Sequence, residues 1–440
     1  MVKVGIAKTD LLEALKPNKP IREERIEVLS LYIADEKKQC VWTVLDYMDF
    51  NLKVVNTIKR KIGEESGISL DNIHVLTTHN HGACEPNAEI LAEISSNCVL
   101  NAKENSKPAK MRYALTKLDE QVSIIRRKYV KEIDSVVSIY YGATAKDGFD
   151  ASPFVENAVE KLKIGKRPFF GKMPTERAFD PFDSGDREVF VCQFASLDGE
   201  PIGTIARFAS HAVCCNSPDY YSSDYPYHVR RNFEREFGGT CVFFNGPCAD
   251  IAPGIENKTS GYEKTLGDLI FGFGKKAIEN LEFSNIKEFS DKSVSISLKV
   301  RKGVRENKVE VKGEMPSDLI ERRKYLERLA YQDTLGFLRE KYAEGESQLS
   351  EKTDISLGIL RIDSLTVVGF PGETFSTTAK EVKEEVKGDL VTVTEHGRTV
   401  MYIPPKLECE RGGYESVCRV TKAGEEQTLK EKAILALKEF

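Results

Sequence analysis

The sequence predicts an α/β protein with a mixed, largely parallel sheet core, flanking helices and an active site at the carboxyl ends of the strands. Short apolar runs are interleaved with longer segments of helical periodicity, as in a sheet covered by helices. Histidines and a glutamate directly follow several of the apolar runs. In open α/β sheets, ligands gather at such strand ends. With 440 residues, the chain can bury the core of one large domain or two.

The first part of the chain has a strand–helix–strand order. Residues 3–7, 26–33 and 39–50 are apolar runs that we interpret as strands, and residues 51–65 carry Leu, Val and Ile at helical spacing. A short buried strand, residues 72–77, follows. Because such units take a right-handed crossover, the strands on either side of the helix are expected to be parallel. The motif THNHG then lies at the carboxyl end of a sheet strand.

The rest of the chain continues this pattern. Asp198 and Gly199 predict a hairpin turn between residues 188–194 and 201–209. The segment 147–186 is rich in Pro, Gly, Phe and charged residues and is expected to be a long loop or lid. The other expected elements are a helix at 87–109, strands at 111–118, 122–128 and 241–244, a helix at 262–281, a strand at 293–300, a charged helix at 317–342, and paired strands at 356–362 and 364–370.

No internal repeat or low-complexity tract is visible in the sequence. We therefore expect a single catalytic domain, residues 1–440, with a helical excursion at residues 315–349. The charged helix of this excursion has three open roles: it could cover the active site, join subunits, or present a solvated face.

Composition limits the partners and the compartment. The net charge is −5, with 40% hydrophobic and 30% charged residues, which gives no reason to expect nucleic acid or an acidic membrane as partner. The N-terminus lacks the apolar core of a signal peptide, and no run is long enough to span a bilayer. A cytoplasmic protein with a small-molecule substrate is expected, and a homo-oligomer stays open. Ten cysteines without a CxxC pair are interpreted as reduced thiols.

Three predicted strand ends carry side chains of the types that bind metals in proteins. His79 and His81 lie two residues apart after one predicted strand, so they share a face. His211 ends the apolar run RFASH, and Glu373 follows another apolar run in the segment VVGFPGE. A single histidine at a strand end is more often a hydrogen-bonded surface residue than a ligand. Together, however, two histidines and a carboxylate form a usual catalytic zinc set with a position left for water or substrate.

Five sequence blocks, in the right order, resemble those of the neutral ceramidases. THNHGACEP resembles the THTHSGPG block, and FASHAVCCNSPDYYSSDYP resembles a segment in which a histidine precedes SSDYP. NGPCADIAPG resembles the GDxSP loop, and GFPGETFS the PGE block. MYIPPKLECERGGYES resembles the tyrosine-bearing segment near the end of the catalytic domain. The likeness spans residues 4–416 and identifies the chain as similar to that catalytic domain, so we expect no counterpart of the immunoglobulin-like domain that follows it in the family.

The resemblance implies a zinc hydrolase. Carried over by position, the zinc ligands are His79, His211, Glu373 and Tyr402. His81 would lie beside the zinc-bound water and shuttle a proton, while Tyr414 would face the substrate carbonyl. Zinc lowers the pKa of its bound water toward about 7, so that this water can attack an amide or ester near neutral pH.

The sequence departs from the family at several positions. Ala252 stands where the GDxSP loop has its serine, and GACEP, with Glu85, replaces SGPG. The family's substrate arginine is not identified, although Arg167, Arg177 and Arg187 lie in or near the window where it is expected. For these reasons, and because no signal segment is found, we expect a smaller soluble amide, ester, lactone or sugar derivative rather than ceramide.

Two other functions stay open. One is cleavage of a glycosidic or related sugar linkage, in which Glu85, Asp224 or Asp250 would act as acid or base. Otherwise Asp224 and Asp250 would support the zinc ligands or simply hold loops. The other is a non-catalytic zinc-containing binding protein with a filled coordination sphere.

Overall fold

The computed structural model describes residues 1–15, 18–20, 22–84, 86–119, 122–140, 152–172, 185–215, 219–253, 261–343 and 350–440. It has the predicted α/β architecture, built on one large mixed sheet in the order β12-β11-β10-β5-β1-β2-β3-β4, with β14 paired to β5. The strands are β1 (Lys3–Asp10), β2 (Glu27–Ala34), β3 (Gln39–Leu45), β4 (Ile73–Thr77), β5 (Lys107–Lys117), β10 (Glu188–Ser196), β11 (Pro201–Phe208), β12 (Thr240–Asn245) and β14 (Ser284–Asn285).

Two strand pairs of the large sheet are parallel. One is β3–β4, as the strand–helix–strand order predicts, and the other is β11–β12. The remaining neighbours are antiparallel, including the predicted β10–β11 hairpin, so the sheet is mixed but less parallel than expected. Short turns, which only antiparallel strands can use, join β2 to β3 and β10 to β11. The strands are also antiparallel where β1 meets β2 and β5, and where β5 meets β10.

Helices cover the outer face of this sheet. The helices α2 (Leu52–Ser66) and α3 (Ala88–Glu104) pack on β1–β4, and α5 (Asp224–Phe237) and α6 (Tyr262–Ile278) pack on β10–β12. Helix α2 begins and ends close to the predicted positions. Asn51 caps its amino end by accepting from Val54 N, and Gly67 ends it in the left-handed conformation.

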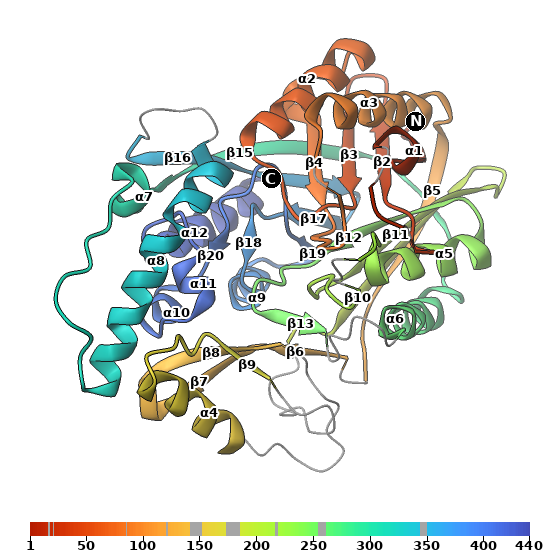
Figure 1. Cartoon of the computed structure of the whole chain (residues 1–440). Coiled ribbons are helices and arrows are strands. Elements are labelled where there is room, and N and C mark those ends of the chain that lie inside the picture. The colour runs from red at the N-terminus through yellow and green to blue at the C-terminus, as the bar shows by residue number, and fades with distance from the viewer. Residues whose placement is uncertain are drawn as a thin grey trace.

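A second sheet packs face to face on the first. It contains β15 (Phe289–Lys299), β16 (Lys352–Ile362), β17 (Leu365–Gly369) and β19 (Asp389–Val393). One buried core joins the inner faces of both sheets. The outer face of the second sheet carries α8 (Leu319–Ala343), α9 (Ser376–Glu385) and α12 (Glu425–Glu439). The layers are therefore helix, sheet, sheet and helix, as Figure 1 shows.

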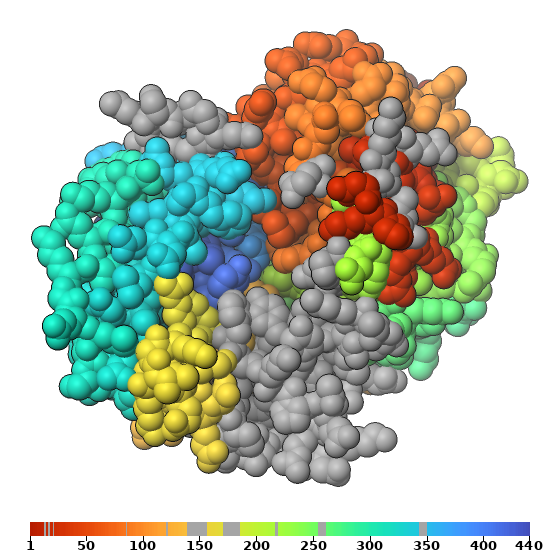
Figure 2. Space-filling view, viewed as in Figure 1, coloured from red at the N-terminus to blue at the C-terminus, as the bar shows by residue number. Residues whose placement is uncertain are grey.

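Smaller elements surround the edge where the two sheets meet. The short strands are β6 (Ser123–Ile125), β7 (Arg127–Val130), β8 (Ser135–Tyr140), β9 (Phe170–Lys172), β13 (Ile251–Pro253), β18 (Glu373–Thr374) and β20 (Tyr402–Ile403). The short helices are α1 (Leu12–Leu15), α4 (Ser152–Lys163), α7 (Lys302–Glu306), α10 (Lys406–Glu410) and α11 (Tyr414–Val417). In Figure 2, C-terminal atoms, in blue, are visible at the middle of this face between the cyan and orange segments.

The segment 147–186 is not simply the long loop that its composition suggests. Its described part contains α4 and β9, because apolar residues on α4 recur at helical spacing. Ala158 and Leu162 of α4 are buried against Leu326 of α8 and neighbouring strands. All ten cysteines are free thiols, as expected. Among the described residues, none of the helices combines the length and apolar character needed to cross a bilayer.

A polar cluster is buried between the two sheets. His74 Nδ1 lies 2.8 Å from His396 Nε2, and His74 Nε2 lies 2.9 Å from an oxygen of Asp291. Trp42 Nε1 donates to the other Asp291 oxygen at 3.1 Å. These bonds join β3 and β4 of the first sheet to β15 of the second. They leave so little space that only glycine fits at position 358 of β16.

We predict that Gly358→Ala destabilises the fold by about 1–3 kcal/mol, the usual range for overpacking a core. The new Cβ would lie 2.6 Å from both His396 Nε2 and His74 Nδ1. Gly272→Ala on α6 is the matched control, since its Cβ would meet no atom within 4 Å and alanine favours a helix. Urea unfolding of the two variants measures the difference. Equal stability would show that the cluster tolerates the added methyl group.

Candidate active site

The two parallel strand pairs deliver two histidines to one point. His79 follows β4, and its Nδ1 donates to the Met48 carbonyl at 3.0 Å. His211 follows β11, and its Nδ1 donates to the Ile251 carbonyl at 2.9 Å. Because a carbonyl only accepts, both rings carry their proton on Nδ1 in the neutral form. Each therefore presents an Nε2 lone pair to the centre of the site.

Glu373 comes from the second sheet and lies between these histidines. Its Oε2 is 3.4 Å from His79 Nε2 and 3.3 Å from His211 Nε2. Within the described part of the chain, neither Glu373 Oε2 nor His211 Nε2 has a hydrogen-bond partner, although both atoms are buried. Buried polar atoms without partners are rare in native proteins. A cation between them would satisfy both.

The charges at this point are strongly coupled. Burial alone would lower the pKa of His79, but the carboxylates of Glu395 and Glu373 raise it to about 9. Burial, with the charges of Arg126 and His79, lowers the pKa of His211 to about 4. Burial opposes ionisation of Glu373, yet the two histidines hold its pKa far below the usual range. The pocket therefore favours an anionic Glu373 beside a positive charge.

His81 lies at the open side of the same group. Its Nε2 is 3.3 Å from His79 Nε2, and its ring centroid is 5.8 Å from that of His211. Burial and the two neighbouring histidines lower its pKa well below the ordinary value. The ligand atoms of His79, His81 and His211 all lie within 4.8 Å of one another, so these three residues could also hold a metal ion. His81 is only half-buried, unlike the other two.

Two tyrosines complete the predicted site. In the β18–β20 pair, Tyr402 lies directly opposite Glu373, which fixes these two residues side by side. The ring of Tyr414, at the start of α11, is 5.7 Å from the Tyr402 ring. The structure thus gathers His79, His81, His211 and Glu373 around one point, and it places the two tyrosines together beside Glu373.

The arginine at this site is Arg126, which the sequence reasoning missed. Its Nη2 donates to the Tyr402 hydroxyl at 2.9 Å, and its Nε donates to Glu415 at 3.0 Å. The substrate arginine was expected in or near residues 147–186, and the structure describes the partners of two of the three candidates there. Arg167 pairs with Asp333, Arg187 bonds to a carbonyl at 3.5 Å, and Arg177 lies outside the described residues.

A signal for Arg126 existed in the sequence. Arg126 and Arg127 form a doublet directly after the apolar run of β6, and a charged pair at a strand end requires a counter-charge when buried. Glu415 provides it, because Arg127 also pairs with Glu415 and Ser138 Oγ donates to the same carboxylate at 2.9 Å. Burial opposes ionisation, but Arg127 and Arg126 keep the pKa of Glu415 below its ordinary value.

The two predicted aspartates hold loops. Asp250 accepts from Ser376 N and Oγ, both at 2.8 Å, which ties β13 to the start of α9. Asp224 accepts from Cys215 N at 2.5 Å and from Tyr225 N at 2.7 Å. Ala252, which stands at the serine position, is buried in β13 opposite Ile124. Glu85 lies outside the described residues.

A second group of potential ligands lies elsewhere. Glu24, His228 and Glu263 are all buried, with ligand atoms within 4.8 Å of one another. Here Arg22 already forms ion pairs with both carboxylates, at 3.5 Å to Glu24 and 2.9 Å to Glu263. His228 Nε2 bonds to Glu24 at 3.1 Å. In this group, the Arg22 guanidinium balances the charge of the two carboxylates. Around Glu373, histidines balance the carboxylate charge.

Neither a protein-family model nor a curated protein matches the sequence. Solved structures match the fold. The neutral ceramidase from Pseudomonas aeruginosa superposes with a TM-score of 0.66 at 14% identity, over 100% of this chain and 74% of that chain. A ceramidase complexed with C2 gives a TM-score of 0.66 at 13% identity, over 100% and 75%. The chain has a ceramidase-like fold. At this identity the likeness concerns the fold, and the ceramidase-like arrangement of strands is what brings the residues above together.

Proposed function

We propose that this protein is a zinc-dependent hydrolase that cleaves an amide, ester or lactone bond in a small soluble substrate, with water as the nucleophile. One observation carries the proposal. Within a ceramidase-like fold, two imidazole Nε2 atoms converge on a buried Glu373 oxygen that has no hydrogen-bond partner in the described structure. Nitrogen and carboxylate donors of this kind suit zinc.

His79, His211, Glu373 and Tyr402 would hold the metal. Bound zinc would supply a Lewis acid that lowers the pKa of water and polarises a carbonyl. Tyr402 becomes a good ligand only as a phenolate, and Arg126 favours that form because its guanidinium donates to the Tyr402 hydroxyl oxygen. The carbonyls of Met48 and Ile251 keep both histidine rings in the tautomer that leaves Nε2 free.

His81 and Tyr414 would handle the substrate. His81 is the half-buried member of the histidine group, so its ring can reach both water and a leaving group and move a proton between them. Tyr414 is also half-buried, and its hydroxyl would donate to the carbonyl oxygen as negative charge develops there. Neither role requires a hydroxyl at position 252, where a buried alanine methyl group stands.

The glycosidase alternative assigns the acid or base to Asp224, Asp250 or Glu85, and Glu85 lies outside the described residues. The carboxylates of Asp224 and Asp250 are already acceptors for backbone N–H groups. A general acid or base needs at least one oxygen that is free to reach the substrate.

The first test is metal content. We expect about one zinc per chain in the wild type and much less than one in His79→Ala and His211→Ala, because each change removes one of the donors. His228→Ala is the matched control, since it removes a buried histidine from the other candidate group. Elemental analysis of the purified proteins measures the ratio. Loss of zinc in His228→Ala alone would assign the metal to the second group and overturn the proposal.

The second test separates chemistry from metal binding. His81→Gln and Tyr414→Phe should retain zinc while kcat falls by about 10²–10³, the usual cost of removing a proton-transfer group or an oxyanion donor. Steady-state kinetics and metal analysis on the same samples measure both effects. If His81→Gln loses the metal in parallel with activity, His81 is a ligand rather than a proton carrier.

The third test identifies the bond. Chromogenic amides, esters, lactones and glycosides, together with a short-chain ceramide, would be assayed with and without a chelator. We expect hydrolysis of acyl substrates, abolished by the chelator and restored by zinc. Cleavage confined to glycosides would contradict the acyl-transfer proposal.

A further inference from the structure

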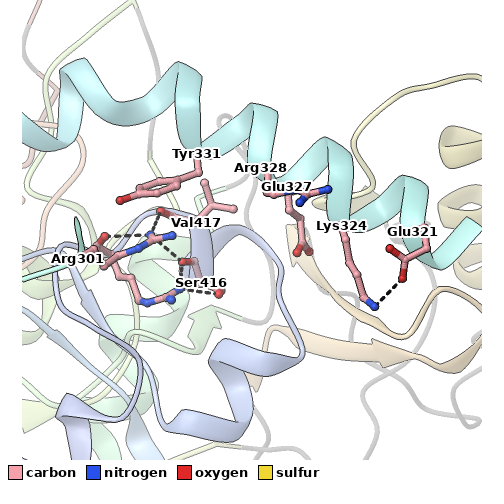
Figure 3. Close-up of a pocket in the computed structure, with 9 residues that line it drawn as sticks. Arg301, Glu321, Lys324, Glu327, Arg328, Tyr331, Ser416 and Val417 are labelled. Atoms are coloured by element: carbon pink, nitrogen blue, oxygen red, sulfur yellow. Dashed lines mark hydrogen bonds and ion pairs between the residues drawn. The ribbon is translucent and has the colours of Figure 1, made fainter. Parts of the chain in front are cut away.

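A separate pocket of about 340 Å³ lies between α8 and the segment around α11, as Figure 3 shows. Cationic side chains dominate its lining, and they are Arg301, Lys324, Arg328 and Arg419. The pocket also contains two carboxylates, Glu321 and Glu327. Its volume lies at the lower end of the range for small-molecule sites.

Both carboxylates are already paired. Glu321 accepts from Lys324 Nζ at 2.8 Å on the same helix. Glu327 pairs with Arg323 at 2.9 Å and accepts from Gly413 N at 3.1 Å. By contrast, Arg301, Arg328 and Arg419 form no ion pair with any carboxylate of the described residues. Among the described residues, these three guanidinium groups therefore have no carboxylate partner.

Arg301 is held firmly in place. Its guanidinium carbon stacks 3.4 Å from the ring centroid of Tyr331. It donates to the carbonyls of Val417 at 3.0 Å and Arg419 at 3.2 Å. These carbonyls satisfy donors without neutralising the charge, and burial together with the Arg419 charge lowers the pKa of Arg301 to about 9. In the described structure, Arg301 is thus held in place without a carboxylate partner.

One buried donor at this pocket has no partner. Arg419 Nε is buried and has no hydrogen-bond partner in the described structure. This nitrogen can only donate. A ligand that accepts several hydrogen bonds and carries negative charge would satisfy the charges and this donor together.

We infer that this pocket binds a tetrahedral oxyanion, as inorganic phosphate or sulfate or as the phosphoryl group of a small molecule, held by Arg301, Arg328 and Arg419. Guanidinium groups match such anions with two parallel hydrogen bonds. The pocket lies against α11, which begins with Tyr414, so an anion here would stabilise the helix that carries one predicted active-site residue. The anion site stands whether or not the hydrolase proposal is correct.

Titration calorimetry of the whole chain with sodium phosphate, at constant ionic strength, tests the inference. We expect saturable binding of one phosphate per chain, weakened about tenfold or more in Arg328→Gln and Arg419→Gln because each loses a charge-assisted hydrogen bond. Arg305→Gln is the matched control. It removes one positive charge from α7, close in sequence to Arg301, but Arg305 pairs with Glu351 outside the pocket. The affinity of the Arg305→Gln protein for phosphate should change less than about twofold.

Several results would overturn the inference. They are the absence of saturable phosphate binding, equal weakening in Arg305→Gln, and unchanged affinity in both pocket variants. Acetate binding as tightly as phosphate would also overturn it, because the site would then prefer a planar carboxylate. The last measurement is the binding of glycerol phosphate. Tighter binding than inorganic phosphate identifies a phosphoryl compound as the ligand, and equal binding identifies the free anion. Thermal unfolding confirms that each variant is folded.

Discussion

The face-to-face packing of the two sheets is the constraint on which the candidate site depends. A single buried core fills the space between them, and the ligand candidates come from both sides of it. His79 and His211 follow strands of the first sheet, whereas Glu373 follows β17 of the second. The histidines of the first sheet and the carboxylate of the second meet because the two layers pack together. A loss of packing between the layers would therefore separate the donors before it disturbed any one of them.

Buried charge is the second constraint. Glu415, with Arg126 and Arg127, forms an ion-pair group at the rim of the site, and each member would be costly to bury alone. The group also fixes the direction of Arg126, whose Nη2 donates to the Tyr402 hydroxyl. The pocket beside α11 shows the opposite case. There, Arg301, Arg328 and Arg419 have no carboxylate partner among the described residues, as expected where a ligand supplies negative charge.

Local sequence patterns predicted local structure well. Periodicity, turn residues and strand ends predicted the β3–α2–β4 unit, the β10–β11 hairpin and the convergence of His79, His211 and Glu373. The patterns did not predict what depends on distant partners. The share of antiparallel pairs depends on the order of strands across the sheet. Arg126 depends on Glu415, which lies 289 residues away in the chain. The helix α4 was hidden by the loop-like composition around it.

Residues with strained backbone lie at the candidate site. In the described residues, His79, Glu395 and Met401 are among the few non-glycine residues with positive φ, at 56°, 57° and 58°. Glu395 lies 3.3 Å from His79 Nδ1, and the Met401 carbonyl accepts from Glu373 N. Each such residue costs of order 1–3 kcal/mol and persists only when its surroundings fix it. Strain concentrated at the contacts of two ligand candidates argues that the fold is built to hold these side chains in one geometry.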